Sequence, residues 1–169
     1  MRISLEELAF HPIVVAETYS SGALDFKGYD FRPAEPVKVN AVAELVGAEI
    51  HVRGHVATRL LASCDRCLDS VILPVDEDFD LFYRPMSTIG QEEEVELPED
   101  ELDVGFFSGD GIEMADVVTE QVILAMPMKV VCREDCLGLC PTCKANLNLG
   151  ACGCTPKKGV SPFSSLKQD

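Results

Sequence analysis

The eight cysteines of this 169-residue chain are the residues best suited to chemistry, because they occur in closely spaced groups. Six lie within CREDCLGLCPTCKANLNLGACGC, which runs from Cys132 to Cys154, and the other two, Cys64 and Cys67, lie upstream in SCDRCL. Zn²⁺ takes about four ligands in a tetrahedron, and two thiolates on one tight turn supply two of its corners. Eight thiols are therefore enough for two tetrahedral sites.

The pairs Cys140–Cys143 and Cys152–Cys154 predict one of these sites. Pro141 stiffens the first turn, and the glycines around the second pair permit the close backbone approach that a chelating turn requires. We interpret CPTC…CGC as a small zinc-ribbon-like knuckle. The remaining thiols form the second set, although on spacing alone Cys136 could serve either site. This set comprises Cys64, Cys67, Cys132 and Cys136.

Three other uses of the thiols are weaker interpretations than structural zinc. Disulfides need an oxidising compartment, and pairing neighbours such as Cys152 and Cys154 would be strained. A thioredoxin-like role for Cys64–Cys67 needs a strand-to-helix setting, whereas a hairpin is predicted there. An iron–sulfur cluster fits the ligands, but the spacings with Gly and Pro favour zinc. We expect two structural zinc ions, because a filled four-thiolate site has no open position for catalysis.

Segments of alternating hydrophobicity predict the sheet that must position these cysteines. VKVNAVAEL (37–45), IHVRGHVATRL (50–60) and VILPVDEDFDLFY (71–83) each place apolar residues on one face and polar residues on the other. The first C-x-x-C falls in the turn between the last two segments. Half-buried alternation of this kind is typical of an antiparallel sheet with one wet face, or of an open barrel.

One segment, DGIEMADVVTEQVILAMP (110–127), has a strong helical pattern. Asp110 and Glu113 are predicted to cap its start, and Pro127 to end it. We expect its apolar face to pack on the sheet. That face comprises Ile112, Ala115, Val118, Val122 and Ala125.

The predicted fold class is α+β: a mainly antiparallel sheet or open barrel, one packed helix and a C-terminal zinc-ribbon-like knuckle. We place an α+β core domain at residues 1–131, with an acidic loop at 88–109. A cysteine-rich zinc-binding segment follows at 132–169 and ends in a short helix at SPFSSL. The exit of the long helix can deliver Cys132 and Cys136 to the hairpin, so one metal ion would tie helix to sheet.

The net charge of −15 is concentrated in the middle of the chain. Residues 71–128 contain 16 acidic side chains and one basic one, whereas residues 129–169 contain six basic and three acidic. Candidates for RNA contact lie on the polar face of the second strand and beside the cysteines, although a solvated sheet face explains the strand equally well. These candidates are His51, Arg53, His55, Arg59, Arg66, Lys144, Lys157 and Lys158.

Sequence patterns for other functions are absent. There is no G-x-S-x-G, no phosphate-binding glycine-rich loop and no H-E-x-x-H, so we predict no enzyme activity and no small-molecule substrate. No apolar run is as long as a membrane span, and the first twenty residues lack a secretory pattern. We therefore expect a cytoplasmic protein without membrane attachment, whose thiols stay reduced and available to metal.

The order of these elements resembles the YceD family. CDRCL, the helix end VTEQVILAMPM and the run CREDCLGLCPTCKANLN…CGC match its motifs in order from Cys64 to Cys154. The terminal SPFSSLK is similar to the short closing helix of the family. Lys144 stands where the family commonly has glycine, and family members vary in the second cysteine cluster. The resemblance therefore implies a knuckle that supports the fold without being essential to the activity.

The resemblance also implies a function: a non-enzymatic ribosome-biogenesis factor that supports accumulation or processing of large-subunit rRNA. Such a factor would bind the rRNA or a pre-ribosomal particle. The alternative is a zinc-stapled interaction module that binds a basic ribosomal protein through its acidic segment. A thiol-based redox sensor that loses zinc on oxidation is a third hypothesis.

Overall fold

The computed structural model describes residues 1–88 and 104–154, and the chain divides into two compact units. The sheet unit comprises Met1–Ala62 and Ile72–Met128, and the cysteine unit comprises Ser63–Val71 and Lys129–Asp169. Each unit therefore joins two separate segments of the chain. The cysteine unit is built from a short internal segment and a much later one.

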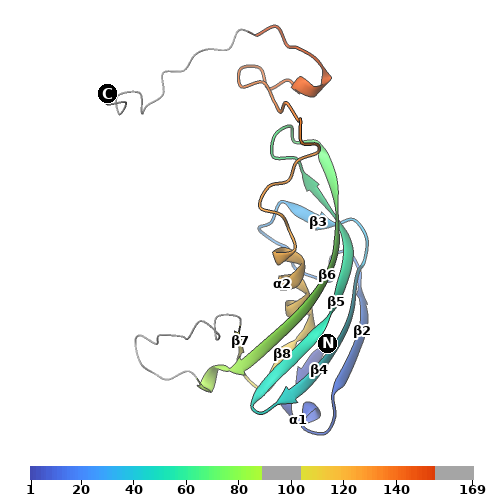
Figure 1. Cartoon of the computed structure of the whole chain (residues 1–169), viewed down its shortest axis with the longest axis vertical. Coiled ribbons are helices and arrows are strands. Elements are labelled where there is room, and N and C mark those ends of the chain that lie inside the picture. The colour runs from blue at the N-terminus through green and yellow to red at the C-terminus, as the bar shows by residue number, and fades with distance from the viewer. Residues whose placement is uncertain (89–103, 155–169) are drawn as a thin grey trace, which may run out of the picture. The chain divides into compact units, whose positions relative to one another are not determined.

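A six-stranded sheet forms the frame of the sheet unit (Figure 1). Its strands are β2 Ile13–Tyr19, β3 Phe31–Pro33, β4 Val37–Val46, β5 Glu49–Ser63, β6 Ser70–Pro85 and β7 Val104–Phe107. The order β2-β4-β5-β6-β7 ends in two different edge strands, so the sheet formed by the described residues is open. β4 pairs antiparallel with both β2 and β5, β3 pairs antiparallel with β5, and β7 lies parallel to β6.

Alternation along the strands separates the core from the polar face, as the sequence predicts. In β4, Val37 and Val39 are buried and Lys38 and Asn40 are exposed. The next strand repeats this pattern, because successive side chains of a strand point to opposite faces. Its buried residues include Ile50, Val52, Val56 and Leu60. The predicted α+β fold with a mainly antiparallel, open sheet is confirmed.

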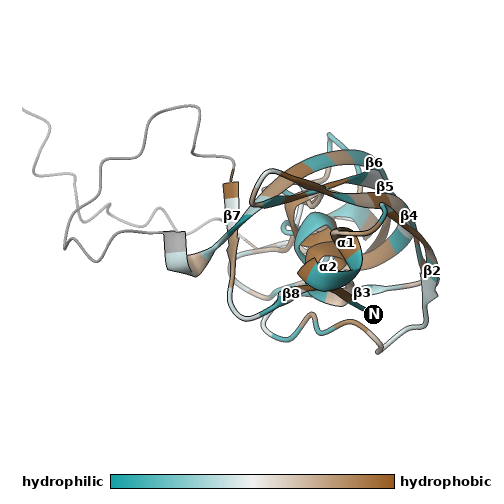
Figure 2. Ribbon diagram, turned by 90° about the horizontal axis from the view of Figure 1, so that it is seen from below, coloured by the Kyte–Doolittle hydropathy of each residue, from teal (hydrophilic) through white to brown (hydrophobic). Residues whose placement is uncertain are grey.

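The long helix α2, Met114–Leu124, packs its apolar side into the concave face of this sheet (Figure 2). Met114 and Val118 are fully buried in the same hydrophobic cluster as the inward side chains of β4 and β5. Removing this much apolar surface from water is the main force holding helix to sheet. The predicted packing of one helix on the sheet is therefore present.

The start of this helix differs from the prediction. Gly111–Glu113 forms strand β8, which pairs antiparallel with β1, Arg2–Ser4. Asp110 pairs with Arg2 instead of capping the helix, and Glu113 makes no side-chain capping bond. The long-range pairing with β1 thus outcompetes the first helical turn. A true capping box starts the short helix α1, Leu5–Leu8, where Ser4 and Glu7 bond reciprocally.

The acidic loop predicted at 88–109 is too long at its C-terminal end, because β7 occupies Val104–Phe107. Its valine and two phenylalanines favour a strand over a loop. The acidic stretch itself falls within residues 89–103, and the predicted terminal helix at SPFSSL within 155–169, both outside the described residues. In the part of the chain that is described, no helix is long and apolar enough to cross a membrane.

Candidate metal centres

The structure brings Cys64, Cys67, Cys132 and Cys136 together within the cysteine unit. Their four sulfur atoms all lie within 4.8 Å of one another. The Cys64–Cys136 and Cys67–Cys132 sulfur pairs are 3.9 Å and 3.6 Å apart. Four thiolates around Zn²⁺ at about 2.3 Å would have their sulfurs about 3.8 Å apart. This first cluster therefore already has the dimensions of a tetrathiolate metal site.

Backbone hydrogen bonds form the turn that carries Cys64 and Cys67. Cys64 N donates to Asp69 O at 2.8 Å and Leu68 N donates to Cys64 O at 2.9 Å, which closes a tight loop. The second half of the cluster is attached through Asp65. Its backbone N donates to Val130 O at 2.8 Å, and its carboxylate accepts from Val130 N at 2.7 Å. These bonds place the segment before Cys132 against the turn.

Arg66 anchors the loop that contains Cys132 and Cys136 of the first cluster. Its Nη1 donates to the carbonyls of Glu134 and Cys136 at 3.0 Å and 2.9 Å, and its own carbonyl accepts from Leu139 N. Gly138 passes close to this carbonyl with φ +73°, and a Cβ at Gly138 would lie 2.8 Å from the Arg66 oxygen. The Arg of the C-x-R-C-L element thus positions the Cys132–Cys136 turn, a role that sequence reasoning missed.

The pKa shifts of the thiols in the first cluster favour binding of a cation. Burial opposes ionisation of Cys64, but hydrogen bonds from the amides of Cys67 and Cys132 outweigh it and lower the pKa of this thiol to about 6. A hydrogen bond from Asn148 lowers the pKa of Cys136. Burial raises the pKa of Cys132. Several thiolates cannot share so small a space unless a metal ion compensates their charge, so the donors suit a soft divalent ion.

The second cluster comprises Cys140, Cys143, Cys152 and Cys154, whose sulfurs also lie within 4.8 Å of one another. Amide hydrogen bonds from Cys143 and Thr142 lower the pKa of Cys140 to about 6. Contact with the neighbouring thiols, first Cys143, raises the pKa of Cys154 to about 12. Only Cys140 is buried here, whereas three of the four thiols in the first cluster are. The two clusters could each hold a metal ion, and the second is the more accessible one.

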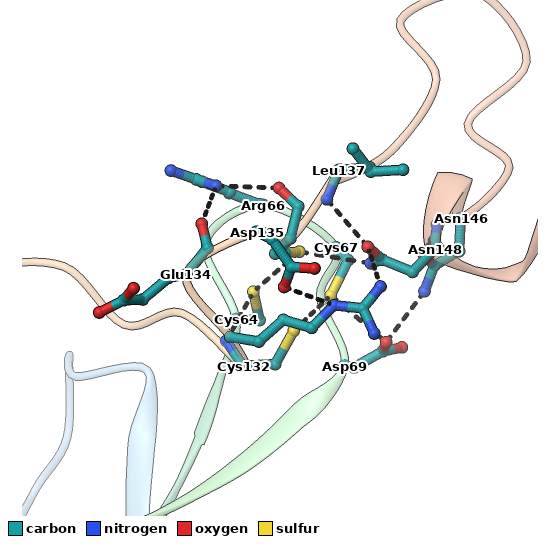
Figure 3. A network of polar contacts seen from close by, with 12 residues as sticks. Cys64, Arg66, Cys67, Asp69, Cys132, Glu134, Asp135, Leu137, Asn146 and Asn148 are labelled. Atoms are coloured by element: carbon teal, nitrogen blue, oxygen red, sulfur yellow. Dashed lines mark hydrogen bonds and ion pairs between the residues drawn. The ribbon is translucent and has the colours of Figure 1, made fainter.

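Two asparagines between the ligand pairs of the second cluster reach back to the first (Figure 3). Asn148 Nδ2 donates to the Cys136 sulfur at 3.3 Å, and Asn148 Oδ1 accepts from Leu137 N at 2.8 Å. Asn146 Nδ2 donates to the Asp69 carboxylate at 2.9 Å. Sequence reasoning did not assign them a role. The only available signal was an Asn-x-Asn run inside the loop of a metal knuckle.

His51, predicted to face RNA, is largely buried on the polar side of the sheet. Its ring stacks on Phe82 with centroids 4.2 Å apart and planes 2° from parallel. Its two ring nitrogens face the carboxylates of Glu44 and Asp80. This side chain is thus enclosed by its neighbours.

The other predicted cations of β5 are more exposed but also lie beside carboxylates. The side chains of Arg53 and Arg59 are 56% and 61% exposed, and their nearest carboxylate oxygens are 3.3 Å and 3.8 Å away. In the cysteine unit Lys144 is exposed, while Lys157 and Lys158 lie outside the described residues. The pairs are His55 with Asp76 and Asp78, Arg53 with Glu44, and Arg59 with Glu35.

Comparison with known proteins gives one family match. The family model described as large ribosomal RNA subunit accumulation protein YceD matches residues 52–168 of this chain. The match includes all eight cysteines and both asparagines of the network. No solved structure matches the chain.

Several known proteins are similar to parts of the chain. An uncharacterized protein of Mycobacterium tuberculosis is 36% identical over 101 residues, which cover 59% of this chain and 46% of that protein. The chloroplastic large ribosomal RNA subunit accumulation protein YCED homolog 1 of Zea mays is 27% identical over 177 residues, covering 87% of this chain and 58% of the maize protein. Its Arabidopsis thaliana counterpart is 24% identical, with 82% and 51% covered. The chain spans about half the length of the relatives it matches.

Proposed function

Because the chain belongs to the YceD family of large ribosomal RNA subunit accumulation proteins, we propose that it supports accumulation or processing of large-subunit rRNA. It does so by binding the rRNA or a pre-ribosomal assembly particle, and it catalyses no reaction of its own. The observation that carries this proposal is the family match over residues 52–168, which contains every cysteine of both clusters. We expect it to act in the cytoplasm, where thiols stay reduced.

The metal proposed for both clusters is zinc, one ion in each. Eight thiolates in two sets of four are the donors that structural zinc sites use. A site closed by four protein ligands has no position for water or substrate, so these ions would stabilise the fold rather than activate a nucleophile. This supports a binding function over a catalytic one. Metal analysis of the purified chain should return about two zinc ions per molecule.

RNA contact is proposed for the exposed cations of the predicted set, which among the described residues are Arg53, Arg59, Arg66 and Lys144. Arg53 and Arg59 have carboxylate neighbours, but exposed ion pairs of this kind are worth only about 0–1 kcal/mol. An RNA phosphate can therefore replace the carboxylate at small cost. Lys157 and Lys158, close in sequence to the second cluster, would extend the contact.

The test is binding to large-subunit rRNA fragments over a series of salt concentrations. Replacing Arg53 and Arg59 with Ala should reduce the slope of log K against log salt by about one for each phosphate that is no longer neutralised. The matched control, Lys27→Ala with Arg32→Ala, removes the same charge from exposed positions off β5. Equal slopes in the two double variants would remove the β5 cations from the interface.

A second candidate is supported by the charge distribution. The sheet unit with its acidic stretch contains 24 acidic and seven basic side chains, and tetrathiolate zinc adds about two negative charges per site to the other unit. A basic ribosomal protein is a natural partner for such a surface.

Neutralising the acidic stretch tests this second candidate. Replacing its Glu with Gln and its Asp with Asn should abolish capture of a basic ribosomal protein and leave rRNA binding intact. Unchanged capture would remove the candidate. The eight positions are Glu92, Glu93, Glu94, Glu96, Glu99, Asp100, Glu101 and Asp103.

A further inference from the structure

We propose that the two cysteine clusters bind metal cooperatively, because Asn146 and Asn148, in the loop that metal closes at the second cluster, complete the surroundings of the first. This inference deepens the proposal of a zinc ion in each cluster and rests on it. It assigns the Asn-Leu-Asn segment as a positioning element shared by two metal sites.

The two asparagines reach both halves of the first cluster (Figure 3). Asn148 serves the Cys132–Cys136 half, where its Nδ2 lies 3.3 Å from the Cys136 sulfur and its Oδ1 accepts from Leu137 N and the Arg133 guanidinium. An N–H donor aimed at a ligand sulfur stabilises the thiolate that binds metal.

Asn146 serves the half of the first cluster that carries Cys64 and Cys67. Its Nδ2 donates to the carboxylate of Asp69, which follows the second cysteine of the turn by two residues and also lies 3.3 Å from its sulfur. The same side chain accepts from Asn148 N through Oδ1 at 3.0 Å. The pair is therefore a single unit: ordering one asparagine orders the other.

The second cluster holds this unit in place from both sides. Cys140–Cys143 precedes the two asparagines, and Cys152–Cys154 follows them. The loop rests on the first pair through backbone bonds, because Cys140 N donates to Ala145 O and Leu147 N donates to Gly138 O. Its other end would be fixed to the first pair by a metal ion that both pairs ligate. A metal ion at the second cluster would close a loop of about ten residues and reduce its conformational freedom.

Coupling of this kind must be reciprocal. If metal at the second cluster raises the affinity of the first by some factor, metal at the first raises the affinity of the second by the same factor. Loss of an outer partner of a metal ligand typically costs about 10–100-fold in affinity. We therefore expect a coupling factor of about tenfold or more.

The experiment measures Zn²⁺ affinities of the full chain by competition with a chelator of known affinity. Cys152→Ser with Cys154→Ser leaves only the first site, and Cys64→Ser with Cys67→Ser leaves only the second. In the intact chain, the overall constant for binding two ions should exceed the product of the two single-site constants by about tenfold or more. A value equal to that product overturns the coupling, while two bound ions would still uphold the zinc assignment.

The variant Asn148→Asp tests the role of the asparagines while all eight cysteine ligands are retained. It replaces the Nδ2 donor beside Cys136 with a carboxylate oxygen, so the coupling factor should fall towards one. Asn40→Asp, the same change at an exposed position of β4, should leave it unchanged. A coupling factor that survives Asn148→Asp overturns the role of the asparagines. An intact chain that binds no zinc overturns the coupling and the zinc assignment together, and neither result depends on RNA binding.

Discussion

Arg66 has a structural role that its charge alone does not reveal. A basic residue between two cysteines suggests a phosphate contact, which stays a prediction for this exposed side chain, while its Nη1 donates to the carbonyls of Glu134 and Cys136. Those carbonyls belong to the turn that brings the last thiol of the first cluster into place. At this scale the geometry of the first cluster depends on hydrogen bonds to the backbone as well as on the cysteines.

The glycine that faces Arg66 gives a prediction at the same scale. Gly138→Ala forces a left-handed conformation on an L-residue, which costs about 1–2 kcal/mol, and pushes a Cβ against the Arg66 carbonyl. We expect faster zinc release from the first cluster, followed with a chromogenic chelator. Gly47→Ala shares the positive φ but has open space around its Cβ and belongs to the sheet unit, so it should release zinc more slowly than Gly138→Ala. Equal rates would show that the close approach is unimportant.

At the scale of elements, the sequence pattern predicts strands and the body of the helix where the decisive contacts are close in sequence. Alternation located β4, β5 and β6, because burial of one face requires a period of two. The helix start and β7 were mispredicted because their partners, β1 and β6, are distant in sequence. Two sets of four cysteines could be predicted from the spacing, but the place of Cys136 in the first set is decided only by the fold. The asparagine network could not be predicted, because its hydrogen bonds join residues up to 77 positions apart.

The packing of α2 gives a prediction at the element scale. Met114→Ala removes a fully buried side chain and should lower the free energy of unfolding by about 2–5 kcal/mol. Leu124→Ala, at an exposed position of the same helix, should change it by no more than about 0.5 kcal/mol. Urea unfolding followed by circular dichroism measures both. Similar losses of unfolding free energy in the two variants would contradict burial of the side of α2 that carries Met114.

On the scale of the whole molecule, the two units have different sources of stability. The sheet unit has an extensive apolar core, whereas the apolar cluster formed by the described residues of the cysteine unit consists of three cysteines with Val71 and Val131 beside them. A core that small cannot offset the entropy of ordering the chain, so we expect the cysteine unit to depend on the metal ions proposed for its two clusters.

Metal removal should therefore affect the units unequally. After treatment with a strong zinc chelator, amides of residues 63–71 and 129–154 should lose protection from hydrogen exchange, while those of β4, β5 and α2 should keep it. Hydrogen-exchange mass spectrometry with and without added Zn²⁺ measures this. Loss of protection across the whole sheet would show that metal holds both units together.

The internal segment of the cysteine unit has a consequence for synthesis on the ribosome. Cys64 and Cys67 leave the exit tunnel about 65 residues before Cys132, so they must wait, reduced and unliganded, until the later thiols emerge. The sheet strands and α2, which come earlier, can fold during that delay. Capture of the ion proposed for the first cluster would thus be a late step in maturation, because it requires thiols from an early and a late segment of the chain.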